Sequence, residues 1–176
     1  MRILRGYLKG KNVKGFNIDG TRPTMDRVKE SIINSIYAHL ENSICLDLFA
    51  GSGNLGFEAI SNGSSKCYFI DNNKKAINII NDNIKVLGIE SKCEVFNMDY
   101  RSFMEKTSKK YDIIFLDPPY KDKIINDILN KIVEKDLLNE NGIVICEYEF
   151  DDINNDKLEL IKEKRYGSKY VKIYKK

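Results

Sequence analysis

The sequence predicts an α/β fold, a three-layer sandwich in which helices cover both faces of a mostly parallel, seven-stranded sheet. From residue 44 onward, five short apolar runs alternate with stretches whose apolar residues recur at helical spacing. This alternation is typical of parallel strands joined by right-handed helical crossovers. Residues 158–165 and 170–174 instead alternate at about period two around Tyr166-Gly167-Ser168, with no helix between them, which predicts an antiparallel hairpin at one edge of the sheet.

An arm and a helix precede this series. Residues 1–20 alternate short β-like pieces with four glycines and predict a short N-terminal β arm or hairpin. Pro23 stands where a helix can begin, and apolar residues at helical spacing predict a helix over residues 23–41. The rest of the pattern predicts strands at 44–49, 67–70, 93–97, 111–116 and 142–148, and helices at 54–62, 73–87, 100–107 and 121–135.

Composition indicates one soluble globular domain over residues 1–176, with residues 1–20 as the arm and residues 21–176 as the core. Hydrophobic residues make up 42% of the chain and charged residues 31%, which is ordinary for a globular protein. No apolar run approaches the roughly 18 residues that suggest a membrane span. We therefore expect a cytoplasmic protein, and we expect it to be a monomer.

The cysteines are predicted to be buried thiols and not zinc ligands or disulfides. Each falls in or beside an apolar, β-like run, and none has C-x-x-C spacing: Cys45, Cys67, Cys93 and Cys146. His39, the single histidine, ends a helical pattern and has no Ser or Cys partner in a recognisable nucleophile motif. The sequence therefore predicts no metal site and no histidine-based catalysis.

Positive charge gathers near the N-terminus, although the formal net charge is only +3. Residues 1–30 hold eight Lys and Arg against three Asp and Glu. Such a segment suggests an arm that faces a polyanion. A lysine-rich composition produces similar segments by itself, so both interpretations stay open at this point.

Asp117-Pro118-Pro119-Tyr120 follows the apolar run of residues 111–116 and is the strongest single motif. Proline cannot donate to a sheet ladder, and it biases the preceding residue away from the α region. The strand must therefore stop here, with a rigidly held carboxylate beside an aromatic ring. Because ligands bind at strand ends in open α/β sheets, this segment suits a flat group that carries an amine.

A glycine-rich turn links the first predicted strand to the next helix, since residues 46–56 read LDLFAGSGNLG. Its glycines let backbone amides approach a nucleotide-like ligand. The spacing Gly51-x-Gly53-x-x-Gly56 also matches the dinucleotide fingerprint of nicotinamide oxidoreductases. Asp47 argues against that class, because its carboxylate would face a pyrophosphate. It suits a ligand with a positive ammonium or sulfonium group, and S-adenosylmethionine carries both.

Carboxylates also end the second and third predicted strands. Asp71 could accept hydrogen bonds from ribose hydroxyls in either cofactor class. Asp99 could accept from an adenine amino group, or it could simply cap the following helix. Together with Asp47 and Asp117, these residues stand at the ends of the first four parallel strands. We expect all four to converge on one edge of the sheet.

On these residues the chain resembles the class I S-adenosylmethionine-dependent methyltransferases of nucleobase amines, whose fourth strand ends in Asp/Asn/Ser-Pro-Pro-aromatic. Four segments extend the resemblance to the bacterial small-subunit ribosomal RNA guanine-N2 methyltransferase family, over essentially the whole chain: Arg22-Pro23-Thr24, residues 46–56, residues 117–120 and Tyr166-Gly167. A mild departure is Asp71-Asn72, where that family often has glutamate followed by another residue. The implied fold is the Rossmann-like class I methyltransferase sandwich.

The resemblance implies S-adenosylmethionine as cofactor and ribosomal RNA, within a small-subunit particle, as partner. Cofactor contacts are expected along the glycine-rich turn and at neighbouring strand ends: Thr24, Asp47, Phe49, Ala50, Gly51, Ser52, Gly53, Asp71, Asn72 and Asp99. The expected catalytic residues are Asp117, Pro118, Pro119 and Tyr120. No membrane partner is expected.

The chemical hypothesis is methylation of an exocyclic amine. The Asp117 carboxylate and the Pro118 carbonyl accept the two N–H groups, Asp117 then receives the proton, and Tyr120 stacks on the base. A base inside a helix cannot reach such a pocket, so the target is single-stranded or flipped out. Candidate phosphate contacts lie near the arm or the site mouth: Arg2, Arg5, Arg22, Arg27 and Lys121.

Three other functions remain open on the sequence. A DNA or RNA adenine-N6 methyltransferase would use the same Asp-Pro-Pro-Tyr chemistry. A nucleic-acid-binding module could keep the fold without activity. A nicotinamide oxidoreductase is remote, because Asp47 opposes it and the double proline would have no use. The residues alone do not distinguish guanine from adenine.

Overall fold

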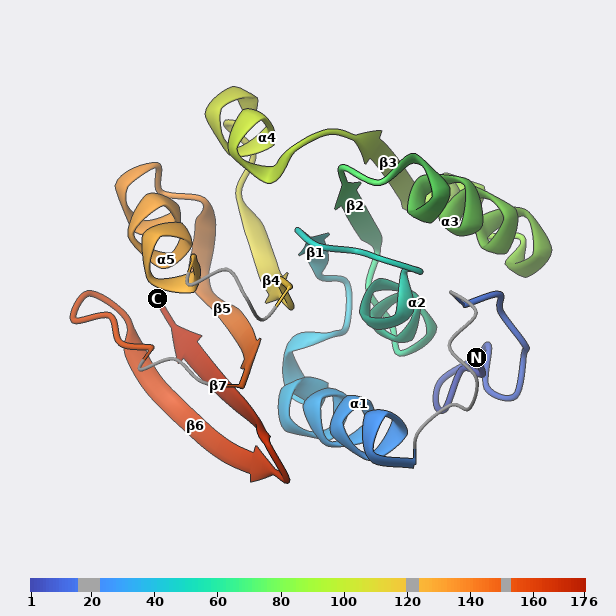
Figure 1. Cartoon of the computed structure of the whole chain (residues 1–176), viewed down its shortest axis with the longest axis horizontal. Helices are drawn as coiled ribbons and strands as arrows, with labels where there is room; N and C mark the ends of the chain where they lie inside the picture. Colours follow the sequence, from blue (N-terminus) through green and yellow to red (C-terminus); the bar gives the residue numbers. More distant parts are fainter. Residues whose placement is uncertain (16–22, 120–123, 150–152) are drawn as a thin grey trace.

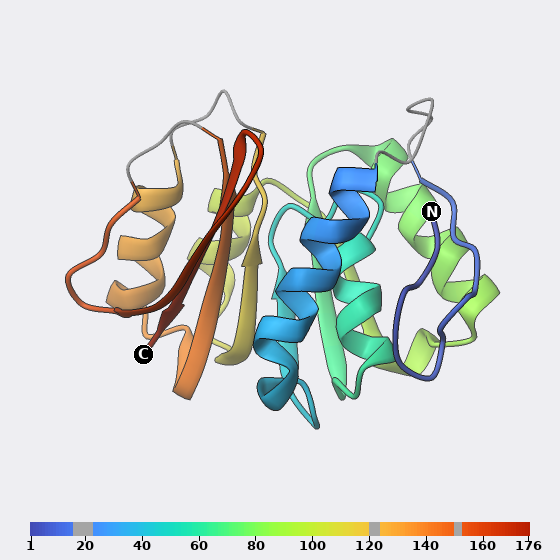
Figure 2. The same ribbon diagram turned by 90° about the horizontal axis from the view of Figure 1, so that it is seen from below.

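The computed structural model describes residues 1–15, 23–119, 124–149 and 153–176, with the side chains of residues 23–25 outside that description. Seven strands form one sheet, with helices against both faces. These are the three layers expected from the sequence (Figure 1), and a second view shows α1 and α2 side by side over the sheet (Figure 2). No described helix has the length and apolar character to cross a bilayer.

The five parallel strands are arranged around β1. β1 (Ile44–Asp47) pairs with β2 (Lys66–Asp71) on one side and with β4 (Tyr111–Leu116) on the other. β3 (Cys93–Asn97) lies beyond β2, and β5 (Leu138–Tyr148) lies beyond β4. The chain thus moves outward through β2 and β3 and returns to the other side of β1. This reversal is the point of an open α/β sheet at which ligands bind.

The last two strands form the predicted antiparallel hairpin. β6 (Glu159–Tyr166) pairs with β7 (Lys169–Lys175), and β7 pairs antiparallel with β5, which gives the order β3-β2-β1-β4-β5-β7-β6. Gly167 in the turn has a positive φ of 64°, a conformation that glycine adopts without steric cost. The hairpin is also attached to the helical layer, because the Tyr166 hydroxyl is hydrogen-bonded to Ser31 Oγ.

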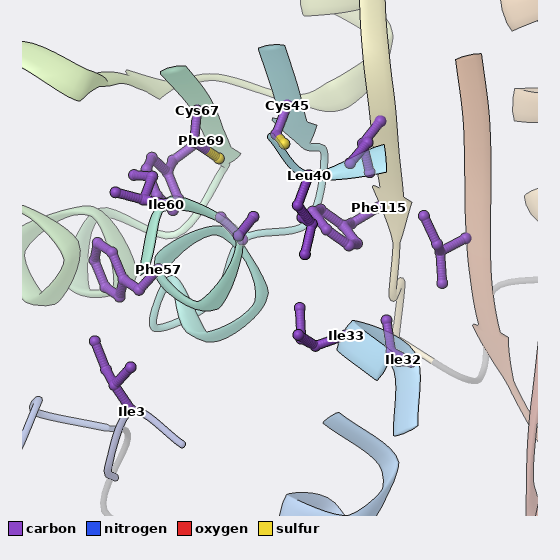
Figure 3. Packing of buried hydrophobic residues seen from close by; sticks show 14 of the residues in the cluster. Ile3, Ile32, Ile33, Leu40, Cys45, Phe57, Ile60, Cys67, Phe69 and Phe115 are labelled. Atoms are coloured by element: carbon purple, nitrogen blue, oxygen red, sulfur yellow. The ribbon is translucent and has the colours of Figure 1, made fainter. Parts of the chain in front are cut away.

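Two apolar cores lie on opposite faces of the sheet. α1 (Pro23–Ile36), α2 (Asn54–Ser61) and α3 (Lys74–Leu87) cover the first face, and α4 (Tyr100–Lys106) and α5 (Ile125–Glu134) cover the second. Strand residues alternate between the cores, as period-two geometry requires. Figure 3 shows side chains of α1, α2 and the central strands meeting in the first core.

Several boundaries differ from the sequence prediction by one or more residues, and three of them show how tertiary contacts set the ends of elements. The helix expected to reach residue 41 ends at Ile36, and a 3₁₀ turn (Tyr37–His39) leads the chain down toward β1. The first strand ends at Asp47, since the Ala50 amide already bonds to the Ile70 carbonyl at 2.9 Å. β5 begins at Leu138 and not at residue 142. The pairing of β4 with β5 has a register shift between Tyr111 and Ile113, and the polar residues after Leu138 hide this part of the strand in the sequence. Residues 121–123 of the expected fifth helix lie outside the described residues.

The cysteines lie within or beside the cores, as the sequence predicts. Cys45, Cys67 and Cys146 are buried, Cys93 is half-buried, and all four are free thiols. Burial raises the pKa of Cys45 to about 11 and that of Cys93 to about 12, so both are protonated near neutral pH. Across the part of the chain that is described, no group of His, Cys, Asp and Glu could hold a metal ion.

The N-terminal segment, residues 1–15, is docked on the body of the protein. Ile3, Leu8 and Val13 are buried in the first core, and one antiparallel bridge joins Arg2 to Asn12 in place of a regular hairpin. Helix side chains hold the segment's backbone: Ser61 Oγ accepts from the amide of Leu8 at 3.0 Å. Figure 2 shows this segment lying along α2 and α3.

A buried ion pair joins this segment to α1 and α2. Lys29 Nζ lies 3.1 Å from Glu58 Oε1, and the two side chains are 3% and 1% exposed. Lys29 Nζ also donates to the Arg2 carbonyl and to Asn54 Oδ1, while the Leu4 amide donates to Glu58 Oε1 at 2.7 Å. Glu58 Oε2 has no hydrogen-bond partner among the described residues. Glu58 therefore depends on Lys29 for compensation of its charge.

Replacing Lys29 with Met should destabilise the protein strongly. A buried charge that loses its partner costs about 3–5 kcal/mol, and Glu58 would keep its carboxylate without a cation. The double variant Lys29→Met/Glu58→Met should lose less than Lys29→Met alone. Urea denaturation of the wild type, of Lys29→Met and of the double variant measures these free energies of unfolding. Lys14→Met, which breaks the exposed Lys14–Asp82 pair, is the control and should change stability far less; a loss from it as large as that from Lys29→Met would contradict the assignment.

Candidate active site

The carboxyl ends of β1, β2 and β4 bring three of the predicted acidic residues to one edge of the sheet. Asp47 ends β1, Asp71 ends β2, and Asp117 directly follows β4. Since both β2 and β4 run parallel to β1 and pair with it, these ends lie next to one another. Asp99 follows β3, the next strand outward. The topology thus brings together the four residues that the sequence places at strand ends.

The glycine-rich turn between β1 and α2 is held by the side chain of Asp71. Asp71 Oδ2 accepts from the Gly51 amide at 2.8 Å, and Oδ1 accepts from the Asn73 amide at 2.8 Å. Gly51 and Gly53 have positive φ values of 54° and 83°, which only glycine adopts readily. This carboxylate therefore shapes the turn, in addition to any contact it makes with a ligand.

The third glycine of the pattern has a packing role. A Cβ on Gly56 would lie 2.3 Å from the Phe69 ring and 2.8 Å from Cys67 Sγ, so a side chain here would push α2 away from β2. The Gly56 amide points toward the site and donates to Asp47 Oδ2 at 3.2 Å. Gly56 thus brings α2 close enough for one of its first amides to reach the carboxylate at the end of β1.

Asp47 is a buried carboxylate with a strongly perturbed proton affinity. Its side chain is 2% exposed. Burial raises its pKa to about 7, and the negative charge of Asp71 adds to this, while hydrogen bonds from the Gly56 and Phe49 amides oppose it. A positively charged group close to Asp47 would favour the ionised form. The site is therefore suited to a cationic ligand.

Asp99 caps α4, which is one of the two roles that the sequence left open. Its Oδ1 accepts from the Arg101 amide at 2.9 Å. An adenine contact by Asp99 stays a prediction. Asn72 is exposed beside Asp71, and its predicted cofactor contact is likewise not tested by the geometry.

Two aromatic rings are in contact near the carboxyl edge of the sheet. The rings of Phe49 and Tyr100 have centroids 5.1 Å apart, and the Arg101 guanidinium lies 4.6 Å from the Tyr100 centroid. Phe49 was expected at the site from its place in the glycine-rich turn. Tyr100 was not, although its position directly after Asp99 was a usable signal.

Asp117 lies among charged groups that come from three other strands. Asp117 is half-buried, Pro118 is buried and Pro119 is exposed. Withdrawal from water raises the pKa of Asp117 well above its usual range; Glu147 raises it further and Lys169 lowers it. Glu147 on β5 and Lys169 on β7 form an ion pair. Sequence reasoning missed both residues, because only the strand order brings them to β4.

The candidate phosphate contacts are spread over the molecule. Arg2 is exposed, and its carbonyl accepts from Lys29, which also bonds to Asn54 at the start of α2 beside the turn. Arg5 stacks over the Tyr37 ring at 5.5 Å, near the end of α1 remote from the site. Arg27 is exposed on α1. Tyr120, Arg22 and Lys121 lie outside the described residues, as does the side chain of Thr24.

Comparison with known proteins identifies a family, two related sequences and a related solved structure. The family model described as "Conserved hypothetical protein 95" matches residues 1–175. "Putative rRNA methyltransferase YlbH" of Bacillus subtilis is 38% identical, with 100% of this chain and 99% of that protein covered. "Ribosomal RNA small subunit methyltransferase D" of Haemophilus influenzae is 34% identical, with 99% and 93% covered. The solved structure "Putative methyltransferase yhhF from Escherichia coli" has a TM-score of 0.90 at 27% identity, with 100% and 97% covered.

Replacing Asp47 with Asn should stabilise the protein at neutral and higher pH. A carboxyl whose pKa is raised by folding holds its proton more tightly in the folded chain, so its contribution to stability falls as pH rises from about 4 to about 7. Each pKa unit is worth about 1.4 kcal/mol, so a rise from 3.8 to about 7 means that the gain from Asp47→Asn should grow to about 4 kcal/mol above pH 7. Asn can still accept from the Gly56 amide.

Urea denaturation of wild type and Asp47→Asn across this pH range measures the gain. Asp82→Asn on α3 is the control, because the pKa of Asp82 is lowered by Lys14 and its substitution should not become more favourable with rising pH. A gain from Asp47→Asn that stays constant with pH would show that Asp47 ionises normally in the folded protein.

Proposed function

We propose that this chain, which belongs to the Conserved hypothetical protein 95 family, transfers a methyl group from S-adenosylmethionine to the exocyclic N2 amine of a guanine in small-subunit ribosomal RNA. Similarity along the whole chain to proteins named as ribosomal RNA methyltransferases supports the reaction and the RNA class. The guanine N2 atom rests on the family resemblance carried together by Arg22-Pro23-Thr24, residues 46–56, residues 117–120 and Tyr166-Gly167. The protein acts as a cytoplasmic monomer on RNA within a small-subunit particle.

The observation that carries the proposal is the placement of Asp117-Pro118-Pro119 beside Asp47. Phe115 on β4 is the register partner of Asp47 on β1, so Asp117 lies two residues beyond the point that faces Asp47. A carboxylate suited to a cationic ligand and a carboxylate suited to an amine therefore stand on neighbouring strands. A methyl donor and a methyl acceptor need to meet in this way.

The residues of this edge fit S-adenosylmethionine, which supplies an electrophilic methyl group on a positively charged sulfonium and also carries an ammonium group. Burial makes the ionised form of Asp47 unfavourable and raises its pKa. A positive group close to the carboxylate would compensate the buried negative charge, so the site favours a cationic ligand. Gly51 and Gly53 hold the turn in a shape that lets backbone amides approach a ligand. Asp71 keeps acceptor capacity for ribose hydroxyls beyond its two backbone bonds, and Phe49 and Tyr100 offer apolar faces next to Asp99.

Asp117 and Pro118 position the nucleophile. An exocyclic amine is a poor nucleophile because its lone pair is delocalised into the ring. The Asp117 carboxylate and the Pro118 carbonyl accept its N–H groups and direct the lone pair toward the methyl carbon, and Asp117 takes the proton that is released. Holding two reactants in line contributes about 7–11 kcal/mol to lowering a barrier, so geometry is the main source of rate. Tyr120 stacks on the base.

The target base has to leave its stack to enter this site, which costs a few kcal/mol unless the RNA is already single-stranded. Arg2 and Arg27 are exposed and, with Arg22 and Lys121, contact the flanking phosphates. Arg5 lies remote from the site and serves a more distant part of a large RNA. Thr24 contacts the methionine end of the cofactor.

Wild-type protein should transfer labelled methyl from S-adenosylmethionine to small-subunit ribosomal RNA, supplied free and within particles, and the product should be N2-methylguanosine. Asp117→Ala should reduce turnover by about 10² or more while leaving cofactor affinity, measured by calorimetry, nearly unchanged. Chromatography of the digested nucleosides identifies the modified base.

Asp82→Ala, an exposed carboxylate on α3, is the matched control and should leave turnover at the wild-type level. Labelled N6-methyladenine in this RNA, or in DNA supplied in a parallel reaction, would replace the guanine assignment by the adenine one. Absence of any labelled nucleic acid would contradict the proposal as a whole and leave a nucleic-acid-binding module without activity.

A further inference from the structure

A row of charged side chains crosses the sheet at its carboxyl edge, on the face covered by α1. The first core takes Phe115 from β4, Ile145 from β5 and Val171 from β7. Strand side chains alternate between faces, so the residues two positions further toward this edge, Asp117, Glu147 and Lys169, belong to the same face.

The strand register brings these three residues together. Leu116 of β4 pairs with Cys146 of β5, so the following residues, Asp117 and Glu147, are neighbours across the two strands. Glu147 pairs with Val171 of β7, which places Lys169 on the diagonal, within reach on one face. The Lys169 ammonium donates to Glu147 Oε1. The ion pair fixes the carboxylate next to Asp117.

This ion pair is sheltered from solvent. The Lys169 and Glu147 side chains are 18% and 8% exposed, whereas the comparable pair between neighbouring strands β2 and β3, Lys66 and Glu94, is 33% and 46% exposed. Since little water screens them, the charges of Glu147 and Lys169 act strongly on the neighbouring Asp117 carboxyl.

Resting on the proposed function, we propose that Glu147 and Lys169 are positioning residues for the methyl transfer, which act through Asp117 to set its readiness to take the proton from the target amine. In the reaction the nitrogen lone pair forms the N–C bond, and the C–S electron pair goes to sulfur. The N–H electron pair stays on nitrogen and the proton goes to a carboxylate oxygen of Asp117. Glu147 strengthens Asp117 as an acceptor, and Lys169 prevents it from holding a proton beforehand.

The other charged groups near Asp117 lie on β1, directly after β5 and on α1. Asp47 on β1 and Glu149, after β5, both raise its pKa, and Glu149 accepts from Ser168 Oγ at 3.5 Å. Lys29 on α1, the helix over this face, is held by Glu58. Among these groups Glu147 and Lys169 have opposite effects: Glu147 raises the pKa of Asp117, and Lys169 lowers it.

The test is the pH dependence of methyl transfer in Glu147→Gln and Lys169→Met. Turnover requires ionised Asp117, so it falls as pH decreases through the pKa of that group. Glu147→Gln removes a negative charge and should move this limb by roughly one pH unit to lower pH, with a reduced plateau; Lys169→Met should move it by a similar amount to higher pH. KM for RNA should stay within about twofold in both, and Lys169→Arg should restore the wild-type profile.

Glu94→Gln and Lys66→Met make the same charge changes at the exposed pair on β2 and β3 and should not shift the profile. A ¹³C NMR titration of the Asp117 carboxyl in the same variants gives a readout that does not depend on turnover. Shifts in the same direction for both variants, or no shift in either while wild type is active and Asp117→Ala is not, would overturn the inference. Inactive wild type would instead overturn the proposed function, and the NMR titration alone would then decide whether Glu147 and Lys169 act on the Asp117 carboxyl.

Discussion

The site depends on one constraint, the pairing of β1 with two parallel neighbours. Because β2 and β4 both run in the direction of β1, their carboxyl ends reach the same edge, and the residues that follow them meet there. The glycine-rich turn crosses this edge, and Asp71 of the neighbouring strand holds it in place through the Gly51 amide. A ligand can therefore be contacted from several strands without any of them bending toward it.

The same arrangement places several carboxyl groups close together at a buried edge of the sheet. Burial raises the pKa values of both Asp47 and Asp117, so ionised carboxylates at this edge oppose stability in the absence of a cation. Proteins retain such unfavourable groups where binding or catalysis requires them. The body of the protein compensates elsewhere, through two apolar cores and through Lys29, whose ion pair with Glu58 joins three segments of the chain.

The sequence predicted the strand and helix series, the hairpin and the family, and the structure and the family match confirm them. It was incomplete where local pattern competes with tertiary contacts. The basic charge of residues 1–30 left two interpretations open, and the structure shows that residues 1–15 are docked on α2 and α3 and that Lys29 is buried. Composition counts charges but does not show which of them reach solvent. The early start of β5 was missed because Asn139 and Glu140 interrupt the apolar pattern.

By itself the sequence determined which residues end the parallel strands, because apolar runs, glycines and prolines act locally on the backbone: Asp47, Asp71, Asp99 and Asp117 could all be placed from pattern. Only the tertiary structure decided what surrounds them. Glu147 and Lys169 reach Asp117 because β7 inserts between β5 and β6, and Asp47 acquires its raised pKa because folding buries its carboxyl at the end of β1. Charge environment depends on distance and burial, which arise when segments far apart in the chain pack together.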